Sequence, residues 1–224
     1  MRRFARDNSL SIVFGLMFLA ALGLQSIAGL HAYNADQLQH HEQAVDWARY
    51  VTSSSFGVDV LENWQSEYLQ FTLFILLTVW LVQRGSTESK EPGKEGGESD
   101  REQRVGAYAR ADSPLWARVG GVRTFVYSNS LVIVMTTIWV LSWLGQSITG
   151  VVDFNQQQQA HGQAAISWAH YLTSADFWDR TLQNWQSEFL AVGSMAIFAV
   201  YLRQRGSPES KPVGASHAAT SIEG

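Results

Sequence analysis

Two long apolar stretches, each followed by a polar segment and then a shorter apolar run, set the pattern of this chain. Residues 9–30 and 130–152 each exceed 20 positions without a charged side chain. A helix needs about 20 such residues to cross a hydrocarbon core roughly 30 Å thick. Residues 68–82 and 189–202 are apolar over only 15 and 14 positions, so each must extend into the polar residues before it. The pattern predicts an all-α membrane protein with four transmembrane helices.

The pattern occurs twice because the sequence itself is repeated. Residues 2–90 align without a gap with residues 123–211 at a constant offset of 121, and 37 of the 89 pairs are identical. Such self-similarity predicts one duplicated structural unit. The basic start of the chain followed by an apolar stretch also fits a secretory signal peptide. Its recurrence in the middle of the chain, where no signal peptide acts, favours two retained helices. Each copy is expected to form a transmembrane helical hairpin.

Lysine and arginine predict how the hairpins are oriented. An excess of these residues marks the cytoplasmic side of a membrane protein, and 14 of the 16 fall on one side of a four-helix topology. Only Arg49 and Arg180 fall on the other. Both termini and the segment between the copies are therefore expected to be cytoplasmic. Two hairpins with the same orientation form parallel repeats, related by an axis along the membrane normal.

Composition sets the expected boundaries. Residues 1–90 form the first hairpin repeat and residues 123–211 the second. Residues 91–122 form a cytoplasmic linker, rich in Gly, Glu, Ser and Lys, which we expect to be largely disordered. The segment 212–224 is expected to be a disordered tail for the same reason. The chain has no cysteine, which excludes disulfide and thiol chemistry.

The polar segment of each hairpin, about 35 residues long, contains a helix signal. Asn34 with Gln37, and Asn155 with Gln158, have the spacing of a capping-box variant, which predicts that a helix begins there. Apolar positions then recur at helical spacing, which indicates an amphipathic helix in each outer loop. Tryptophan and tyrosine favour the membrane interface. The predicted interfacial anchors are Trp47, Trp168, Trp64, Trp185, Tyr50 and Tyr171.

The most distinctive block of the repeat is Asn-Trp-Gln-Ser-Glu, at 63–67 and again at 184–188. Counting residues along the helices places its glutamate level with a glutamine of the outgoing helix, near the outer boundary of the hydrocarbon. A lone carboxylate is costly at that depth. We therefore expect each glutamate either to accept hydrogen bonds within its own hairpin, from Gln25, Ser26, Trp47 or Trp64 in the first copy, or to be protonated. The candidate polar site comprises Glu67, Glu188, Gln25, Gln146, Asn63, Asn184, Gln65 and Gln186.

These blocks, together with Asn-Ser-Leu, Gln-Ser-Ile-x-Gly, Trp-x-x-Tyr-x-Thr-Ser and Gln-Arg-Gly-Ser-x-Glu-Ser-Lys, occur in both copies. The chain thereby resembles an uncharacterised family of bacterial two-repeat integral membrane proteins, known only as a domain of unknown function. The resemblance covers the whole chain except the linker and the tail. It implies a bacterial source, and hence location in the cytoplasmic membrane. It implies no activity, substrate or cofactor.

Three functions remain open. The first, which we favour, is a non-enzymatic structural or accessory protein that docks another membrane protein, or a second copy, through its outer helices. The second is a small pore or carrier for protons, cations or polar solutes that uses Glu67 and Glu188, since intramembrane acids mark ion pathways by default.

The third is an extracytoplasmic metal-dependent enzyme, suggested by residues of the first outer loop. His31, Asp36, His40, His41 and Glu42 lie close together there, but the second copy keeps only His161 among the equivalent positions. We therefore expect no resident metal or cofactor, no enzymatic activity and no nucleic-acid partner. The expected environment is the lipid bilayer.

Overall fold

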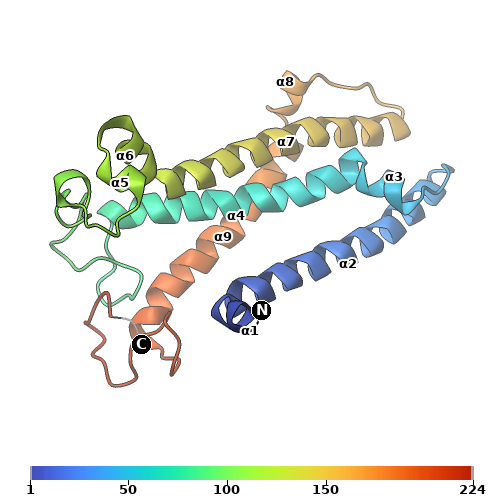
Figure 1. Ribbon diagram of the computed structural model, residues 1–224. Coiled ribbons are helices and arrows are strands. Elements are labelled where there is room, and N and C mark those ends of the chain that lie inside the picture. The colour runs from blue at the N-terminus through green and yellow to red at the C-terminus, as the bar shows by residue number, and fades with distance from the viewer. Residues whose placement is uncertain (1, 223–224) are drawn as a thin grey trace. The chain divides into compact units, whose positions relative to one another are not determined.

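The computed structural model describes residues 2–222, and every regular element among them is helical (Figure 1). The elements in chain order are α1 (Arg2–Asp7), α2 (Ser9–Gln39), α3 (Trp47–Val51), α4 (Ser54–Trp80), η1 (Gly106–Tyr108), α5 (Leu115–Arg118), α6 (Gly121–Ser128), α7 (Ser130–Ala160), α8 (Trp168–Tyr171) and α9 (Ala175–Tyr201). The all-α prediction is confirmed.

Among residues 2–222, two helices have the length and composition of membrane spans. They are α2 and α7, each 31 residues long. Both contain the apolar stretches from which the outgoing crossings are predicted. The helices α4 and α9, 27 residues each, begin directly after Thr52-Ser53 and Thr173-Ser174, and so include the polar residues that the shorter apolar runs were expected to use.

The outer ends of α2 and α7 correct the capping-box prediction. Asn34 does not begin a helix, because α2 continues past it to Gln39. The helix ends where His41 takes a positive φ of 60° and the Glu42 amide bonds back to the Gln37 carbonyl at 2.8 Å, a left-handed helix end. Glycine is favoured in that conformation, and Gly162 occupies the equivalent position after α7, with φ of 70°.

The asparagines instead fix the loops that follow the two long helices. The Asn34 side chain donates to the Val45 carbonyl at 2.9 Å and accepts from the Val45 amide at 2.8 Å. Asn155 makes the same two bonds with Ile166, at 2.9 and 2.8 Å. Each side chain pairs with the backbone as a neighbouring strand would, which satisfies both polar groups of a loop residue.

The predicted amphipathic outer helices are much shorter in the structure. In each copy the helical segment is reduced to α3 or α8, five and four residues long. Asp46 caps α3 by accepting a hydrogen bond from the Arg49 amide at 2.8 Å, and Ser167 caps α8 through the His170 amide at 3.3 Å. These caps lie 12 residues after the predicted caps Asn34 and Asn155, because the residues between belong to α2 and α7 or to the loops.

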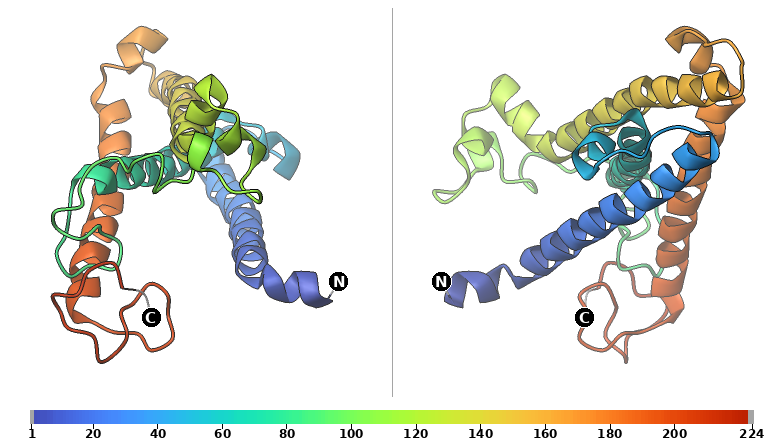
Figure 2. Two further views of the ribbon diagram at one scale, coloured as in Figure 1. Left: turned by 60° about the vertical axis from the view of Figure 1, so that its left-hand side comes forward. Right: turned by 90° about the vertical axis from the view of Figure 1, so that its right-hand side faces the viewer.

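The chain divides into two compact units, each of which contains parts of both repeat copies. The first unit consists of residues 1–61 and 145–177, and the second of residues 62–144 and 178–224. In the first unit, α3 packs beside the outer part of α2 (Figure 2). In the second unit, α5 packs on α6.

A repeated turn follows α4 and α9 in the second unit. The Gln83 amide donates to Ser89 Oγ at 2.8 Å, and the Gln204 amide donates to Ser210 Oγ at 2.8 Å. Residues 83–90 and 204–211 therefore adopt the same local arrangement around their shared Gln-Arg-Gly-Ser-x-Glu-Ser-Lys sequence. The two turns also touch, since Thr87 Oγ1 donates to the Glu209 carbonyl at 3.4 Å.

Lys211 ties the tail to both turns. Its side chain is buried, and Nζ donates to the carbonyls of Gly85 at 2.6 Å, Ser216 at 3.3 Å, His217 at 3.0 Å and Ala219 at 3.1 Å. Composition predicts a disordered tail after residue 211, whereas in the structure these residues wrap around a buried ammonium. The four carbonyls replace the water that a buried ammonium loses, and their hydrogen bonds are strengthened by its charge.

Replacing Lys211 with methionine is expected to destabilise the protein by about 1–3 kcal/mol, because four carbonyls lose their shared donor. Thermal unfolding of the full chain in detergent measures this. Lys90→Met is the matched control: Lys90 occupies the equivalent position, is 27% exposed and makes a salt bridge with Glu98, so its loss should cost no more than about 1 kcal/mol. Equal effects for the two variants would contradict the structural role given to the four hydrogen bonds of Lys211.

Candidate functional site

The Asn-Trp-Gln-Ser-Glu blocks of the two copies meet in the second unit. Trp185 Nε1 donates to Gln65 Oε1 at 2.8 Å, and Ser66 Oγ donates to Glu188 Oε1 at 3.4 Å. One turn before Gln65, Glu62 forms an ion pair with Arg180 at 3.2 Å. These three contacts join α4 to α9, and we call them the α4–α9 seam. Each links a residue of the first copy to one of the second.

The seam changes the role predicted for the glutamates. Glu188 takes its hydrogen bond from Ser66 of the other copy, so the expectation that each glutamate serves its own hairpin is wrong for Glu188. Two of the four donors proposed for the first glutamate are engaged elsewhere: the Trp47 indole donates to Ser26 Oγ at 3.0 Å, and Ser26 Oγ donates to the Gly23 carbonyl at 2.8 Å. Glu67 is exposed and lies near enough to Glu188 to interact with it electrostatically. The two acids therefore belong to one region of the second unit.

The remaining members of the candidate polar site make none of the three seam contacts. Asn184 bonds to the Arg180 carbonyl of its own helix at 2.9 Å, while Asn63 and Gln186 are exposed. Gln25 and Gln146 belong to the first unit, where Gln25 is exposed and Gln146 is fully buried. Of the eight predicted residues, the structure thus brings together Gln65, Glu188 and Glu67.

An aromatic cluster from α7 and α9 surrounds the seam. Trp143 lies 5.7 Å from Trp185 and 6.1 Å from Trp178 between ring centroids, and stacks on Trp139 at 5.9 Å. Aromatic pairs at these separations stabilise a fold beyond the area that they bury. The first copy has Phe18, Leu22 and Gly57 in place of the tryptophans at 139, 143 and 178, so this cluster is specific to the second copy.

The predicted interfacial anchors divide into two groups. Trp47, Trp64 and Trp168 are exposed, as an interfacial position requires, and Trp168 repeats the bond of Trp47 by donating to Ser147 Oγ at 3.1 Å. Trp185 lies half-buried in the seam. Tyr50 and Tyr171 are buried, so the interfacial role predicted for them is wrong. Both are core residues of the first unit.

Each of these tyrosines lies over a helix glycine. A Cβ added to Gly29 would overlap the Tyr50 hydroxyl, and one added to Gly150 would lie 2.6 Å from the Tyr171 hydroxyl. Because glycine has no side chain, the tyrosine rings can lie directly on α2 and α7 at these positions. Burial, reinforced by the carboxylates of Asp59 and Asp153, raises the pKa of the Tyr50 hydroxyl, which therefore stays neutral.

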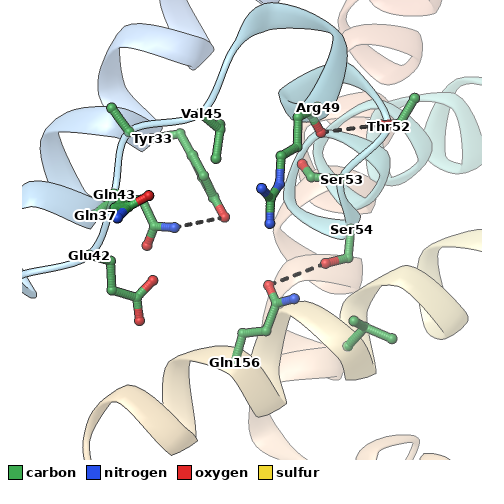
Figure 3. Close-up of a pocket in the computed structure, with 12 residues that line it drawn as sticks. Tyr33, Gln37, Glu42, Gln43, Val45, Arg49, Thr52, Ser53, Ser54 and Gln156 are labelled. Atoms are coloured by element: carbon green, nitrogen blue, oxygen red, sulfur yellow. Dashed lines mark hydrogen bonds between the residues drawn. The ribbon is translucent and has the colours of Figure 1, made fainter.

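The outer end of the first unit contains a polar pocket of about 540 Å³ (Figure 3). Figure 3 shows Arg49 pointing into it between Tyr33 and Ser54, with Glu42 on the opposite side. Gln37 Nε2 donates to the Tyr33 hydroxyl at 3.2 Å, and Ser54 Oγ donates to Gln156 Oε1 at 3.5 Å.

A second pocket of about 730 Å³ shares part of this lining and extends to His40 and His161. The sequence places these histidines at equivalent positions of the two copies, but it does not show that they meet. Among residues 2–222, no group of three or more His, Asp or Glu side chains has the geometry to hold a metal ion.

Comparison with known proteins gives one match. A family model described as a domain of unknown function (DUF6766) matches residues 1–222. No curated protein and no solved structure matches the chain.

Proposed function

The chain belongs to the DUF6766 family, whose description assigns no activity, and we propose that it is a four-crossing integral membrane protein with a structural or accessory role. In this proposal α4 and α9 join α2 and α7 as spans, the repeat copies are two parallel hairpins, and the protein resides in a bacterial cytoplasmic membrane with both termini inside. The outer loops dock a partner membrane protein. The copies act as one fixed unit and carry out no chemistry.

The observation that carries this proposal is the α4–α9 seam. Glu62 with Arg180, Gln65 with Trp185, and Ser66 with Glu188 pair polar groups of two predominantly apolar helices. In a bilayer such groups need partners, because no water is present to satisfy them. In this proposal the three pairings of the seam hold the copies together. Polar groups that are paired with one another are not available to bind a passing solute, so the seam favours a rigid scaffold over a transport path.

A pore or carrier is the second candidate, and the location of Glu67 and Glu188 in the same region of the second unit favours it. Close carboxylates can bind a proton or a cation between them. However, beyond the seam, toward residues 80 and 201, α4 and α9 are apolar apart from Gln70 and small hydroxyl side chains such as Thr78 and Ser194. An ion would meet no further charged group there.

Flux measurements on the purified full chain in liposomes separate these functions. We expect no proton or potassium flux above that of protein-free liposomes, with the wild type and with Glu188→Gln alike. The glutamine keeps an acceptor for Ser66, so the protein should stay folded, and unfolding in detergent checks this. Flux in the wild type that disappears in Glu188→Gln would overturn the structural role and establish the pore.

A further inference from the structure

His40 and His161 occupy equivalent positions of the two copies and lie side by side. Their ring centroids are 5.7 Å apart, with the ring planes inclined by 72°. Each histidine directly follows the outer end of a long helix, α2 for His40 and α7 for His161. Both line the 730 Å³ pocket of the first unit.

The hydrogen bonds of the two rings fix which nitrogen is free. Nδ1 of His40 lies 3.0 Å from the Asp36 carbonyl oxygen, and Nδ1 of His161 lies 2.7 Å from the Gln157 carbonyl oxygen. A carbonyl oxygen only accepts, so Nδ1 carries the proton in both neutral rings. The lone pair is then on Nε2. Metal-binding histidines commonly show this arrangement, in which a backbone carbonyl orients the ring and selects the tautomer.

The separation of the rings suits a shared ion. With a metal–nitrogen bond of about 2.0–2.1 Å, the metal lies roughly 3.2 Å from an imidazole centroid. Two imidazoles on one metal then have centroids about 5.2 Å apart at a tetrahedral angle and about 6.4 Å apart when opposite one another. The observed 5.7 Å falls between these values.

The charges around the pair favour a cation. The carboxylates of Asp36, Glu42 and Asp153 line the same pocket, against the single guanidinium of Arg49. Three negative charges and one positive charge leave a net charge of −2 while the histidines are neutral. Asp36 Oδ1 also lies 3.7 Å from His40 Nδ1, where it can help to orient the ring.

We propose that His40 and His161 bind one divalent transition-metal ion through their Nε2 atoms, linking the outer ends of α2 and α7. Since no third protein ligand is in place among residues 2–222, water completes the coordination. The site is therefore open and exchangeable. Imidazole ligands suit Cu²⁺, Ni²⁺ and Zn²⁺, and the expected order of affinity places Cu²⁺ first.

The test is a titration of the tag-free full chain in detergent with Zn²⁺ and with Cu²⁺, followed by calorimetry. We expect one ion per chain, and binding weakened roughly tenfold or more in His40→Ala and equally in His161→Ala, because each variant removes one of two ligands. His41→Ala and His170→Ala are the controls. Both histidines are exposed, and neither lines the pocket, so their loss should leave binding unchanged.

Electron paramagnetic resonance of the Cu²⁺ complex supplies a second measurement, with couplings from two imidazole nitrogens expected in the wild type and from one in either single variant. Unfolding curves establish that the variants are folded. Absence of Zn²⁺ and Cu²⁺ binding by the wild type would overturn the proposal. So would binding that survives in His40→Ala or His161→Ala, or that is lost equally in a control.

Discussion

Replacing Gly29 with alanine is expected to destabilise the protein by about 1–3 kcal/mol, because the new methyl group overlaps the buried Tyr50 hydroxyl. Gly150→Ala should have the same sign and a smaller size, since its Cβ would lie 2.6 Å from the Tyr171 hydroxyl. Both rings are closely packed by aromatic neighbours, Phe56 at 5.3 Å from Tyr50 and Phe177 at 5.6 Å from Tyr171. Both rings are also almost completely buried.

The control substitutions lie in the same helix. A Cβ at Gly15 or Gly23 meets nothing within 4 Å, so alanine there should be neutral or stabilising by up to about 1 kcal/mol through its better helix propensity. Equilibrium unfolding in detergent, followed by tryptophan fluorescence, measures all four variants. If Gly29→Ala were as stable as Gly15→Ala, the placement of Tyr50 against α2 would be incorrect.

The second large effect is expected at the α4–α9 seam. Gln65 is fully buried, and its Oε1 accepts the Trp185 indole bond at 2.8 Å. Trp185→Phe leaves that oxygen without its donor, and Gln65→Leu leaves the indole without its acceptor. We expect each to cost about 1–3 kcal/mol. The double variant should cost less than the sum of the two, because both remove the same bond.

The repeat supplies a control for these three variants. Gln186 occupies the position of Gln65 in the second copy but is exposed, so Gln186→Leu should change stability by no more than about 0.5 kcal/mol. Exact additivity of Gln65→Leu and Trp185→Phe would show that the two side chains are not coupled. The seam would then lose its role in joining the copies.

Local signals predicted most of the helices. The uncharged apolar stretches located α2 and α7, and the shorter apolar runs located the second halves of α4 and α9. The prediction that Asn34 caps a helix was wrong for a physical reason. An asparagine side chain can bond to a helix amide or to a distant loop backbone equally well, and the sequence spacing does not distinguish the two. In the structure it pairs with Val45, eleven residues later.

The candidate site was predictable only in part, for a different reason. The sequence identifies Gln65, Glu67 and Glu188 as polar groups in apolar helices, but partners within a hairpin and partners across copies fit the same pattern. The bond from Ser66 to Glu188 and the approach of His40 to His161 depend on how α2, α4, α7 and α9 are arranged. A repeat specifies equivalent positions, and does not specify which of them meet.

The central claim, four crossings with parallel hairpins, is tested most directly by labelling single cysteines. The chain has no cysteine of its own, so exposed positions can be substituted one at a time and treated with a membrane-impermeant maleimide on intact and on opened cells. We predict that Ala44 and Ala165 positions label from outside, whereas Arg6, Gly97 and Glu209 positions label only after opening. If α2 and α7 were the only spans, the Gly97 position would label from outside and the Ala165 position would not, and that result would contradict the account.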